Sequence, residues 1–125
     1  MTDGYYSYKM DMWGVGCVIY EMLTFVPLFS GNDEYDQVIR IHSVIGSTPK
    51  DLIEKYKKQS SHMELKFPEA VGTGLGTLMP KDQYSADAVD LVTKLIKHHP
   101  EDRLSASKAL DHPWFKELRE QDKIL

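Results

Sequence analysis

The segment DMWGVGCVIYEML, from Asp11 to Leu23, is the feature that most constrains the fold. Its only charged residues are Asp11 and Glu21, so a helix over this segment has almost no polar face. Such a helix belongs in the interior of a protein. Gly14 and Gly16 each cost about 1 kcal/mol relative to Ala in a helix, which indicates close packing by a neighbouring backbone. We therefore predict a buried central helix over this segment.

Capping residues and hydrophobic periodicity predict two helices after it. Asn32 or Asp33 can cap a helix that stops at Gly46. Its apolar stripe consists of Tyr35, Val38, Ile39, His42 and Ile45. Thr48, with Asp51 three residues on, is a capping-box signal for a short helix that ends near Lys57 or Lys58. Leu52, Ile53 and Tyr56 would form its inner side.

Periodicity disappears from Gln59 to Asp82, which predicts a long surface excursion with one short extended piece at Glu64–Phe67. Its glycines, Gly72, Gly74 and Gly76, do not form a phosphate-binding loop, because Thr77 stands where that spacing needs a further glycine. A flexible surface loop is the favoured interpretation.

Serines mark the starts of two later helices. Ser85 caps a helix that ends before Pro100, and Ser105 caps a short last helix. The apolar stripe of the first is Ala88, Leu91, Val92, Leu95 and Ile96, and the second carries Ala106, Ala109 and Leu110. Trp114 and Phe115 follow as bulky anchors. The fold class is therefore mainly α, in one domain with a long irregular insertion.

Composition excludes several classes of function. Fifteen basic and nineteen acidic residues give a net charge of −4, which argues against nucleic acid as a partner. The uncharged run Met12–Tyr20 is about half the roughly 20 residues of a membrane span, and the first residues do not resemble a secretion signal. One cysteine, Cys17, suits a reducing compartment, so we expect an intracellular protein, cytoplasmic or nuclear.

Residues that carry chemistry are sparse. Cys17 lies in the most apolar segment, where a thiol is usually inert. His98 and His99 are adjacent, and their side chains should diverge rather than converge on a metal. We therefore expect no metal site, no cofactor site and no catalytic residue in residues 1–125.

Two segments read together indicate a family. DMWGVGCVIYEML resembles the D-x-W-x-x-G pattern of the central helix in the C-lobe of eukaryotic protein kinases. HHPEDRLSASKALDHPWF resembles that family's closing segment, D-P-x-x-R-x-[ST]-A-x-x-A-L-x-H-P-[WY]-F, although His99 stands where the family normally has aspartate. PLFSG, GSTP and the Gln37 and Ile41 positions resemble the cyclin-dependent and mitogen-activated kinase (CMGC) group. The opening TDGYYSYKMDMWGVGCVIYEM looks most like the MAK/MOK (RCK) kinases.

The resemblance covers residues 1 to 118, with the group's insertion at about 50–82 and a charged tail at 119–125. It implies the lower half of the C-lobe of a serine/threonine kinase whose complete form uses ATP and magnesium to phosphorylate proteins. The glycine-rich loop, strand lysine, H-R-D, D-F-G and A-P-E motifs are not in this sequence, so we expect this chain alone to be inactive. The alternative is a kinase-derived, non-catalytic module for protein interaction.

The residue roles that the resemblance implies are structural. Asp11 would accept hydrogen bonds from the catalytic-loop backbone. Trp13 and Gly16 would pack beneath the activation segment, and Val18 and Met22 would form the floor of the apolar column under the adenine. Glu21 corresponds to a position that meets a basic substrate residue in some kinases, although a structural or solvent-facing role is equally open.

Arg103 would pair with the glutamate of the A-P-E motif. Within residues 1–125 alone, its replacement is therefore expected to change stability by little. The implied partners are the remaining half of the kinase domain and protein substrates of the parent. The apolar helix Asp11–Leu23 would leave an exposed patch where that half is absent, which predicts self-association.

Overall fold

The computed structural model describes residues 2–59 and 68–116. Its elements in chain order are α1 (Thr2–Thr24), α2 (Glu34–Ile45), α3 (Lys50–Gln59), α4 (Leu75–Leu78), α5 (Ala86–Leu95), the 3-10 helix η1 (Pro100–Asp102), α6 (Ala106–Leu110) and the 3-10 helix η2 (Pro113–Phe115). The described residues contain no strand, which confirms the mainly α fold class.

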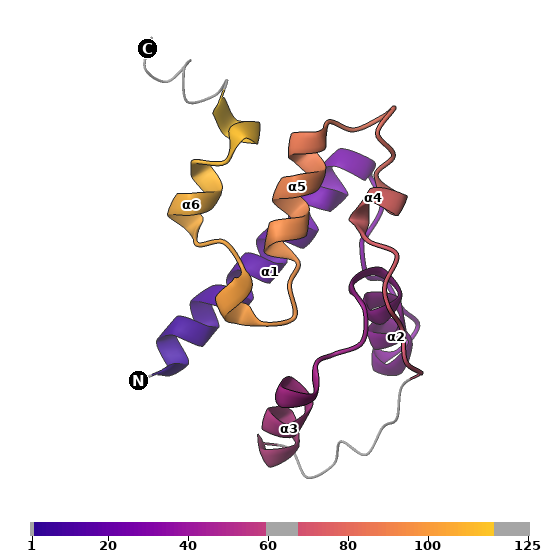
Figure 1. Cartoon of the computed structure of the whole chain (residues 1–125), viewed down its shortest axis with the longest axis vertical. Helices are drawn as coiled ribbons and strands as arrows, with labels where there is room; N and C mark the ends of the chain where they lie inside the picture. The colour runs from indigo at the N-terminus through magenta and orange to yellow at the C-terminus, as the bar shows by residue number, and fades with distance from the viewer. Residues whose placement is uncertain (1, 60–67, 117–125) are drawn as a thin grey trace.

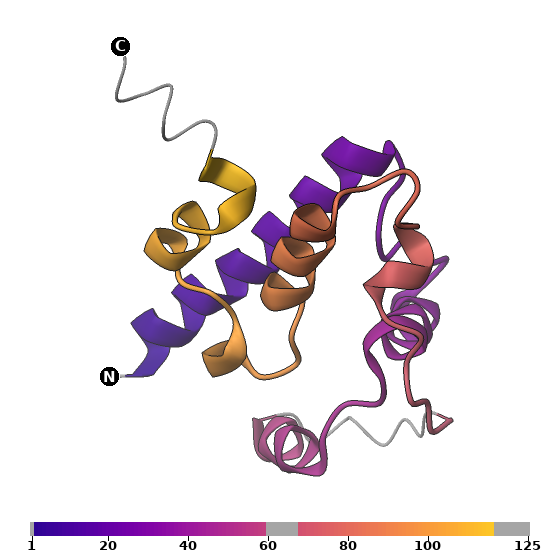
Figure 2. The ribbon, with the colours of Figure 1, turned by 45° about the horizontal axis from the view of Figure 1, so that its top comes forward.

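Helix α1 runs through the molecule, and α5 lies along it (Figures 1 and 2). Contacts join α1 to α5 and to η1, and join α5 to α4 and to η2. In both views α6 lies on one side of the α1–α5 pair, and α2 and α4 lie on the other. The α1–α5 pair is therefore the centre around which the shorter elements are placed.

The long apolar helix is present but begins at Thr2 instead of Asp11. Tyr8 and Lys9 join this earlier part to the C-terminal region. The Tyr8 hydroxyl accepts a hydrogen bond from the amide of Ala106, and the Lys9 ammonium donates one to the carbonyl of Arg103. These long-range contacts were not visible in the sequence pattern.

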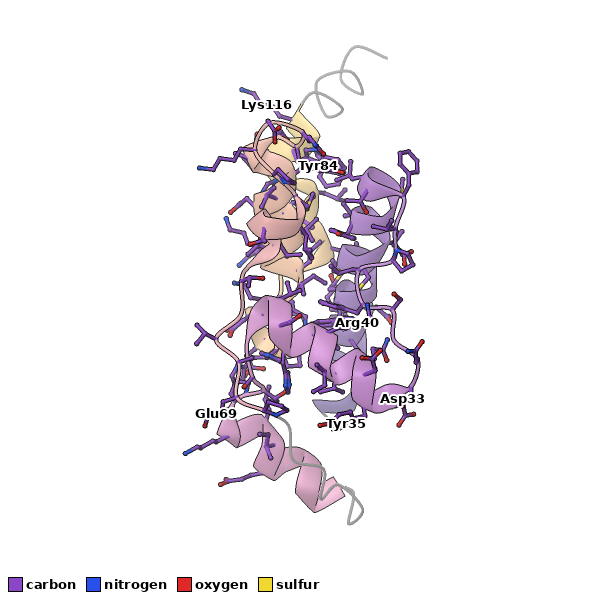
Figure 3. All side chains as sticks on the ribbon, turned by 90° about the vertical axis from the view of Figure 1, so that its right-hand side faces the viewer. Asp33, Tyr35, Arg40, Glu69, Tyr84 and Lys116 are labelled. Carbon is purple, nitrogen blue, oxygen red and sulfur yellow. The ribbon has the colours of Figure 1, made fainter. Side chains whose placement is uncertain are left out.

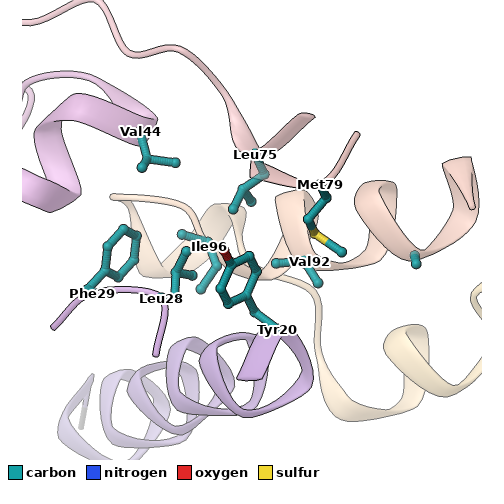
Figure 4. Packing of buried hydrophobic residues seen from close by; sticks show 9 residues of the cluster. Tyr20, Leu28, Phe29, Val44, Leu75, Met79, Val92 and Ile96 are labelled. Atoms are coloured by element: carbon teal, nitrogen blue, oxygen red, sulfur yellow. The ribbon is translucent and has the colours of Figure 1, made fainter. Parts of the chain in front are cut away.

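The core consists of two clusters that share α1 and α5. Figure 4 shows the first, whose labelled members are Tyr20, Leu28, Phe29, Val44, Leu75, Met79, Val92 and Ile96. The second contains Met12, Leu91, Leu95 and Ala109. Leu91, Val92 and Leu95 of α5 are fully buried, as is Met79 at the end of α4.

The capping predictions for the last helices are confirmed. The Ser85 hydroxyl accepts from the amide of Ala88, 3.1 Å away, and the Ser105 hydroxyl accepts from the amide of Lys108, 3.2 Å away. All the predicted core residues of α5 are buried. Helix α6 carries Ala106, Ala109 and Leu110 as predicted, and of these Ala109 is the one that is buried.

Helix α2 starts and stops as predicted, and of its predicted stripe His42 is buried, Val38, Ile39 and Ile45 are half-buried, and Tyr35 is exposed. Asp33 caps it by accepting from the amide of Asp36, 2.8 Å away. Val44 is buried, whereas Tyr35 is exposed and lies with Asp33 and Arg40 on the α2 side of the molecule in Figure 3. The buried residues of this helix, His42 and Val44, lie in its C-terminal half, whereas Tyr35 belongs to its first turn.

Gly72 has a packing role in place of the flexible one that we predicted. Gly46 and Gly72 both have positive φ, at 90° and 89°. A Cβ at Gly72 would lie 2.5 Å from the amide nitrogen of Gly46, so the two backbones meet too closely for any side chain. The amides of Thr73 and Gly74 donate to carbonyls of Ser43 and Val44, which fastens this segment to the end of α2.

The prediction that the Thr48 side chain caps α3 is wrong. Its hydroxyl lies 2.8 Å from Nε2 of His42, which belongs to α2. Helix α3 begins at Lys50 and ends at Gln59, slightly beyond the predicted end. The extended piece expected at Glu64–Phe67 and the tail at 119–125 lie outside the described residues.

Candidate functional site

The candidate site is the junction between α1 and the loop that follows η1. The Trp13 ring stacks on Phe29 with centroids 5.6 Å apart, and the Arg103 guanidinium carbon lies 5.1 Å from the Trp13 ring centroid. Trp13 and Arg103, both assigned roles near the activation segment by the resemblance, are thus brought into direct contact. A cation over an indole face in a partly buried place is stabilising.

Arg103 is buried and, among the described residues, donates hydrogen bonds to three backbone carbonyls. Its guanidinium donates to Lys97 at 2.8 Å, to Lys9 at 3.0 Å and to His98 at 3.3 Å. Because the Lys9 ammonium donates to the Arg103 carbonyl, the two residues exchange side-chain and backbone contacts across 94 positions of sequence. The arrangement holds the first half of α1 against the η1 loop.

These contacts change the expectation for Arg103. The sequence indicated that its main partner is a glutamate outside residues 1–125, so that its replacement here would matter little. The structure gives it contacts within the chain, and they are to carbonyl oxygens that no charge pattern reveals. A substantial loss of stability is now expected on its replacement, and the pairing with an upstream glutamate remains a prediction.

Gly16 marks the closest approach of α1 to α5. A Cβ there would lie 2.8 Å from Cδ1 of Ile96 and 2.9 Å from Cβ of Leu95. The expectation of close packing thus holds at Gly16, with side chains of α5 as the neighbours. It is wrong at Gly14, where a Cβ would meet nothing within 4 Å.

The other predicted residues lie on the opposite side of α1. Val18 is 53% exposed and Met22 is 70% exposed, and Asp11 and Glu21 are exposed too. Sequence reasoning did not single out Val15, which is also exposed and has the same spacing. We call Val15, Val18 and Met22 the outer stripe. Their intervals of three and four residues could have identified it, since residues at that spacing share a helix face.

Cys17 is half-buried on α1, and its environment makes the thiol unreactive. Burial raises its pKa to about 11, and the nearby Glu21 charge contributes in the same direction. Because the thiolate is the nucleophilic form, a thiol with this pKa is protonated at neutral pH.

The histidines make separate contacts. His98 binds the carbonyl of Gly46 and His99 binds the carboxylate of Asp51, so the two side chains diverge as expected. His112, in the closing motif, accepts from the amide of Trp114 through Nδ1 and lies 2.7 Å from Asp90 of α5 through Nε2. Among residues 2–59 and 68–116, no group of three or more His, Cys, Asp or Glu side chains could hold a metal ion.

The helices of the described part of the chain include none that is both long enough and apolar enough to span a membrane.

The central apolar helix and the closing segment are the parts that define the class. Residues 1–115 match the family model of the protein kinase domain. The chain therefore belongs to the protein kinase family.

Comparison with individual members of that family shows which group of kinases the chain is similar to. The chain is 40% identical over 123 residues to the human MAPK/MAK/MRK overlapping kinase, covering 98% of this chain and 29% of that protein. It is 39% identical over 116 residues to the rat serine/threonine-protein kinase MAK, covering 92% of this chain and 18% of that protein. The fission yeast protein kinase gsk3 is 33% identical over 115 residues, covering 92% of this chain and 29% of the yeast protein. The predicted likeness to MAK/MOK kinases of the CMGC group is confirmed, and the chain spans less than a third of these relatives.

Proposed function

We propose that residues 1–118 form the lower half of the C-lobe of a serine/threonine kinase domain, with the CMGC insertion at about 50–82. The complete domain would transfer the γ-phosphate of ATP to protein serine or threonine. The observation that carries this proposal is the kinase-domain match over residues 1–115. The outer stripe supports it, because a row of exposed apolar side chains on a central helix indicates a missing neighbour.

The chain by itself would not catalyse phosphoryl transfer. That reaction depends on positioning of the phosphates and on charge stabilisation by metal ions and basic groups. No residue between 1 and 125 is assigned to ATP or magnesium, and both would be held by the other half of the domain. The function of this half is to support that site from below.

The two faces of α1 would divide this support. On the inner face, Trp13 and Gly16 would underlie the activation segment, and Arg103 would hold that segment through its glutamate. On the outer face, Asp11 would accept hydrogen bonds from the catalytic-loop backbone. Val18 and Met22 would be the floor of the apolar column that ends under the adenine. The exposure of both apolar side chains supports this role, since it leaves them accessible to a covering element.

The remaining half of the kinase domain is thus the proposed partner of the outer stripe, and the parent's substrates are proteins. Without that half, the stripe would drive self-association through apolar contact. The parent would act inside the cell, in the cytoplasm or the nucleus.

A chimera tests the proposal. The 125-residue chain would replace the matching segment of the human MAPK/MAK/MRK overlapping kinase, and phosphorylation of a generic protein substrate would be measured with magnesium ATP. We expect the chimera to be active and the chain alone to bind no magnesium ATP in calorimetry. A folded but inactive chimera, or micromolar ATP binding by the chain alone, would contradict the proposal.

Two matched substitutions in the chimera locate the supporting surface. Met22→Lys changes an exposed apolar residue of the outer stripe, and Leu110→Lys changes one on α6 that is 58% exposed. Met22→Lys should abolish activity and Leu110→Lys should leave it unchanged. Equal effects would show that the outer stripe does not support the active site.

The alternative function is a kinase-derived, non-catalytic interaction module, and the exposure of the outer stripe favours it equally. In that case the stripe binds an unrelated protein instead of the other half of a kinase. The inactive but folded chimera described above is the result that would favour this alternative.

A further inference from the structure

Three histidines meet where the end of α2, the start of α3 and the link between α5 and η1 come together. His42 is buried on the last turn of α2, and its ring centroid lies 5.9 Å from that of His98, with the planes at 65°. His98 and His99 lie in the link and line a cavity of about 400 Å³ between these elements. Nothing in the proposed kinase role uses these three side chains.

The contacts of His42 fix its protonation state. The backbone amide of Thr48 donates to Nε2 of His42 at 3.3 Å, and an amide N–H can only donate. Nε2 therefore carries no hydrogen, and the Thr48 hydroxyl, 2.8 Å away, donates to it as well. The geometry requires neutral His42 with its proton on Nδ1. A second proton would set an N–H of the ring against the N–H of Thr48.

His98 reinforces this requirement. Its Nε2 lies 2.8 Å from the carbonyl of Gly46, so it donates a hydrogen bond in either charge state. Burial, and next the neighbouring His98, lower the pKa of His42. Burial is also the main cause that lowers the pKa of His98, although the Gly46 bond opposes it. Burial therefore disfavours charge on both rings, and at His42 the Thr48 amide disfavours it as well.

His99 has the opposite preference. Its Nε2 lies 2.8 Å from the carboxylate of Asp51 in the first turn of α3, and its Nδ1 lies 3.8 Å from that of Asp102. The Asp51 bond is the main cause that raises the pKa of His99 and lowers that of Asp51. The aspartate that the family normally has at this position would repel Asp51, so this attachment depends on the residue at which the chain departs from the family pattern.

We propose that His42, His98 and His99 form a pH-dependent latch that sets how α3, the first element of the insertion, is attached to the lobe. Above about pH 7 neutral His42 holds the Gly46–Thr48 turn to α2, while the His99–Asp51 contact is weaker. As the pH falls, charged His99 holds α3 to the η1 link through Asp51, while protonation of His42 sets its ring N–H against the Thr48 amide and loosens the turn. The charged groups that face these rings are Asp51, Lys97, Glu101, Asp102 and Arg103.

The signs follow from proton linkage. His42 and His98 have lowered pKa values in the folded chain, so their contribution to stability is present above about pH 6.5 and is lost as the pH falls below it. His99 has a raised pKa, so its contribution is present below about pH 6.5, while Asp51 stays ionised, and is lost as the pH rises through the raised value. Acidification therefore weakens one attachment and strengthens the other.

Nuclear magnetic resonance of the 125-residue chain tests the latch. Long-range ¹H–¹⁵N spectra of the histidine rings should show the Nδ1–H tautomer for His42 at pH 8 and a higher pKa for His99 than for His42. The protection of the Thr48 amide against hydrogen exchange should fall between pH 7.5 and 5.5, by up to about tenfold for a single histidine with an ordinary pKa in the open state. In His42→Gln, whose amide oxygen accepts at every pH, this protection should not depend on pH.

Matched carboxylate variants test the other attachment. Asp51→Asn should return the His99 pKa to its ordinary range, and Asp102→Asn, at the longer distance, should shift it less. Equal shifts would refute the assignment of Asp51. An Nε2–H tautomer for His42 at pH 8, or Thr48 protection in the unmodified chain that is the same at both pH values, would overturn the latch. The tautomer is read in the unmodified chain, so it does not depend on any variant folding.

Discussion

The two faces of α1 carry similar side chains and have opposite environments. On the inner face, Gly16 leaves no room for a Cβ, and Met12 and Tyr20 are buried against α5 and its neighbours. On the outer face, Val18 and Met22 are more than half exposed. Apolar character alone therefore does not decide which face of α1 is buried. The buried face is the one against which α5 packs.

This difference separates stability from function along one helix. A side chain in a full core contributes by its transfer from water and by its packing, and an exposed one contributes little to folding. The outer stripe adds little to the fold of this chain, so its apolar residues call for another explanation. A covering element from the rest of a kinase domain is the explanation that we propose.

The largest effect should come from the helix that fills the inner face. Leu95 has no exposed surface, and Leu95→Ala should reduce the free energy of unfolding by about 2 to 5 kcal/mol. Met22→Ala, on the outer face, should change it by less than about 0.5 kcal/mol in the monomeric chain. Urea denaturation of both variants, at a concentration where the chain is monomeric, measures the contrast. Similar losses in the monomer would mean that another part of the same chain covers the outer face.

Arg103→Ala should have the next largest effect, about 2 to 4 kcal/mol, because it removes hydrogen bonds to three carbonyls and the contact with Trp13. Arg103→Lys serves as the control, since an ammonium keeps the charge but cannot span all three carbonyls. It should recover less than half of the loss in chemical denaturation. Full recovery by Lys would show that charge alone explains the role of Arg103.

Replacing either glycine of α1 with alanine should change the stability by a smaller amount, and the two changes should have opposite signs. Gly16→Ala should destabilise by about 1 to 3 kcal/mol, because its Cβ would overlap Leu95 and Ile96. Gly14→Ala has open space and should stabilise by up to about 1 kcal/mol through helix propensity. Thermal unfolding of the two variants would measure these opposite changes in stability. Destabilisation by both substitutions would place an unseen neighbour against Gly14.

Structural features that depend on residues close together in the sequence could be predicted. The caps at Asp33, Ser85 and Ser105 depend on one side chain and an amide three residues away, and all three are as expected. The buried side of α5 follows from its strict periodicity. The family resemblance also follows from local motifs, since the α1 segment and the closing segment each carry their residues within a few turns.

Features that depend on distant partners were not predictable. Arg103 binds carbonyl oxygens, which every residue has, so no residue type signals the contact. Thr48 had a good capping pattern, yet His42 on the preceding helix engages its hydroxyl instead. The sequence pattern predicted a flexible loop at Gly72, because its partner, Gly46, is far away in sequence.

The smallest expected effect lies away from both faces of α1, at the exposed contact between His99 and Asp51. The pKa of His99 is raised mainly by Asp51, so folding favours the protonated ring. By linkage, the stability gained is present below about pH 6.5 and disappears as the pH rises through the raised value.

His99→Gln should therefore lower the free energy of unfolding at pH 5.5 and leave it unchanged at pH 9. His42 is present in both proteins, so its opposite dependence cancels in the difference, whereas the pKa of His98 should rise slightly in the variant, because charged His99 lowers it. Urea titrations at the two pH values measure it, and salt should weaken the effect at pH 5.5, because both partners are near the surface. A difference that grows with pH would mean that His99 is held as a neutral ring, and the attachment of α3 to η1 would then not be an ion pair.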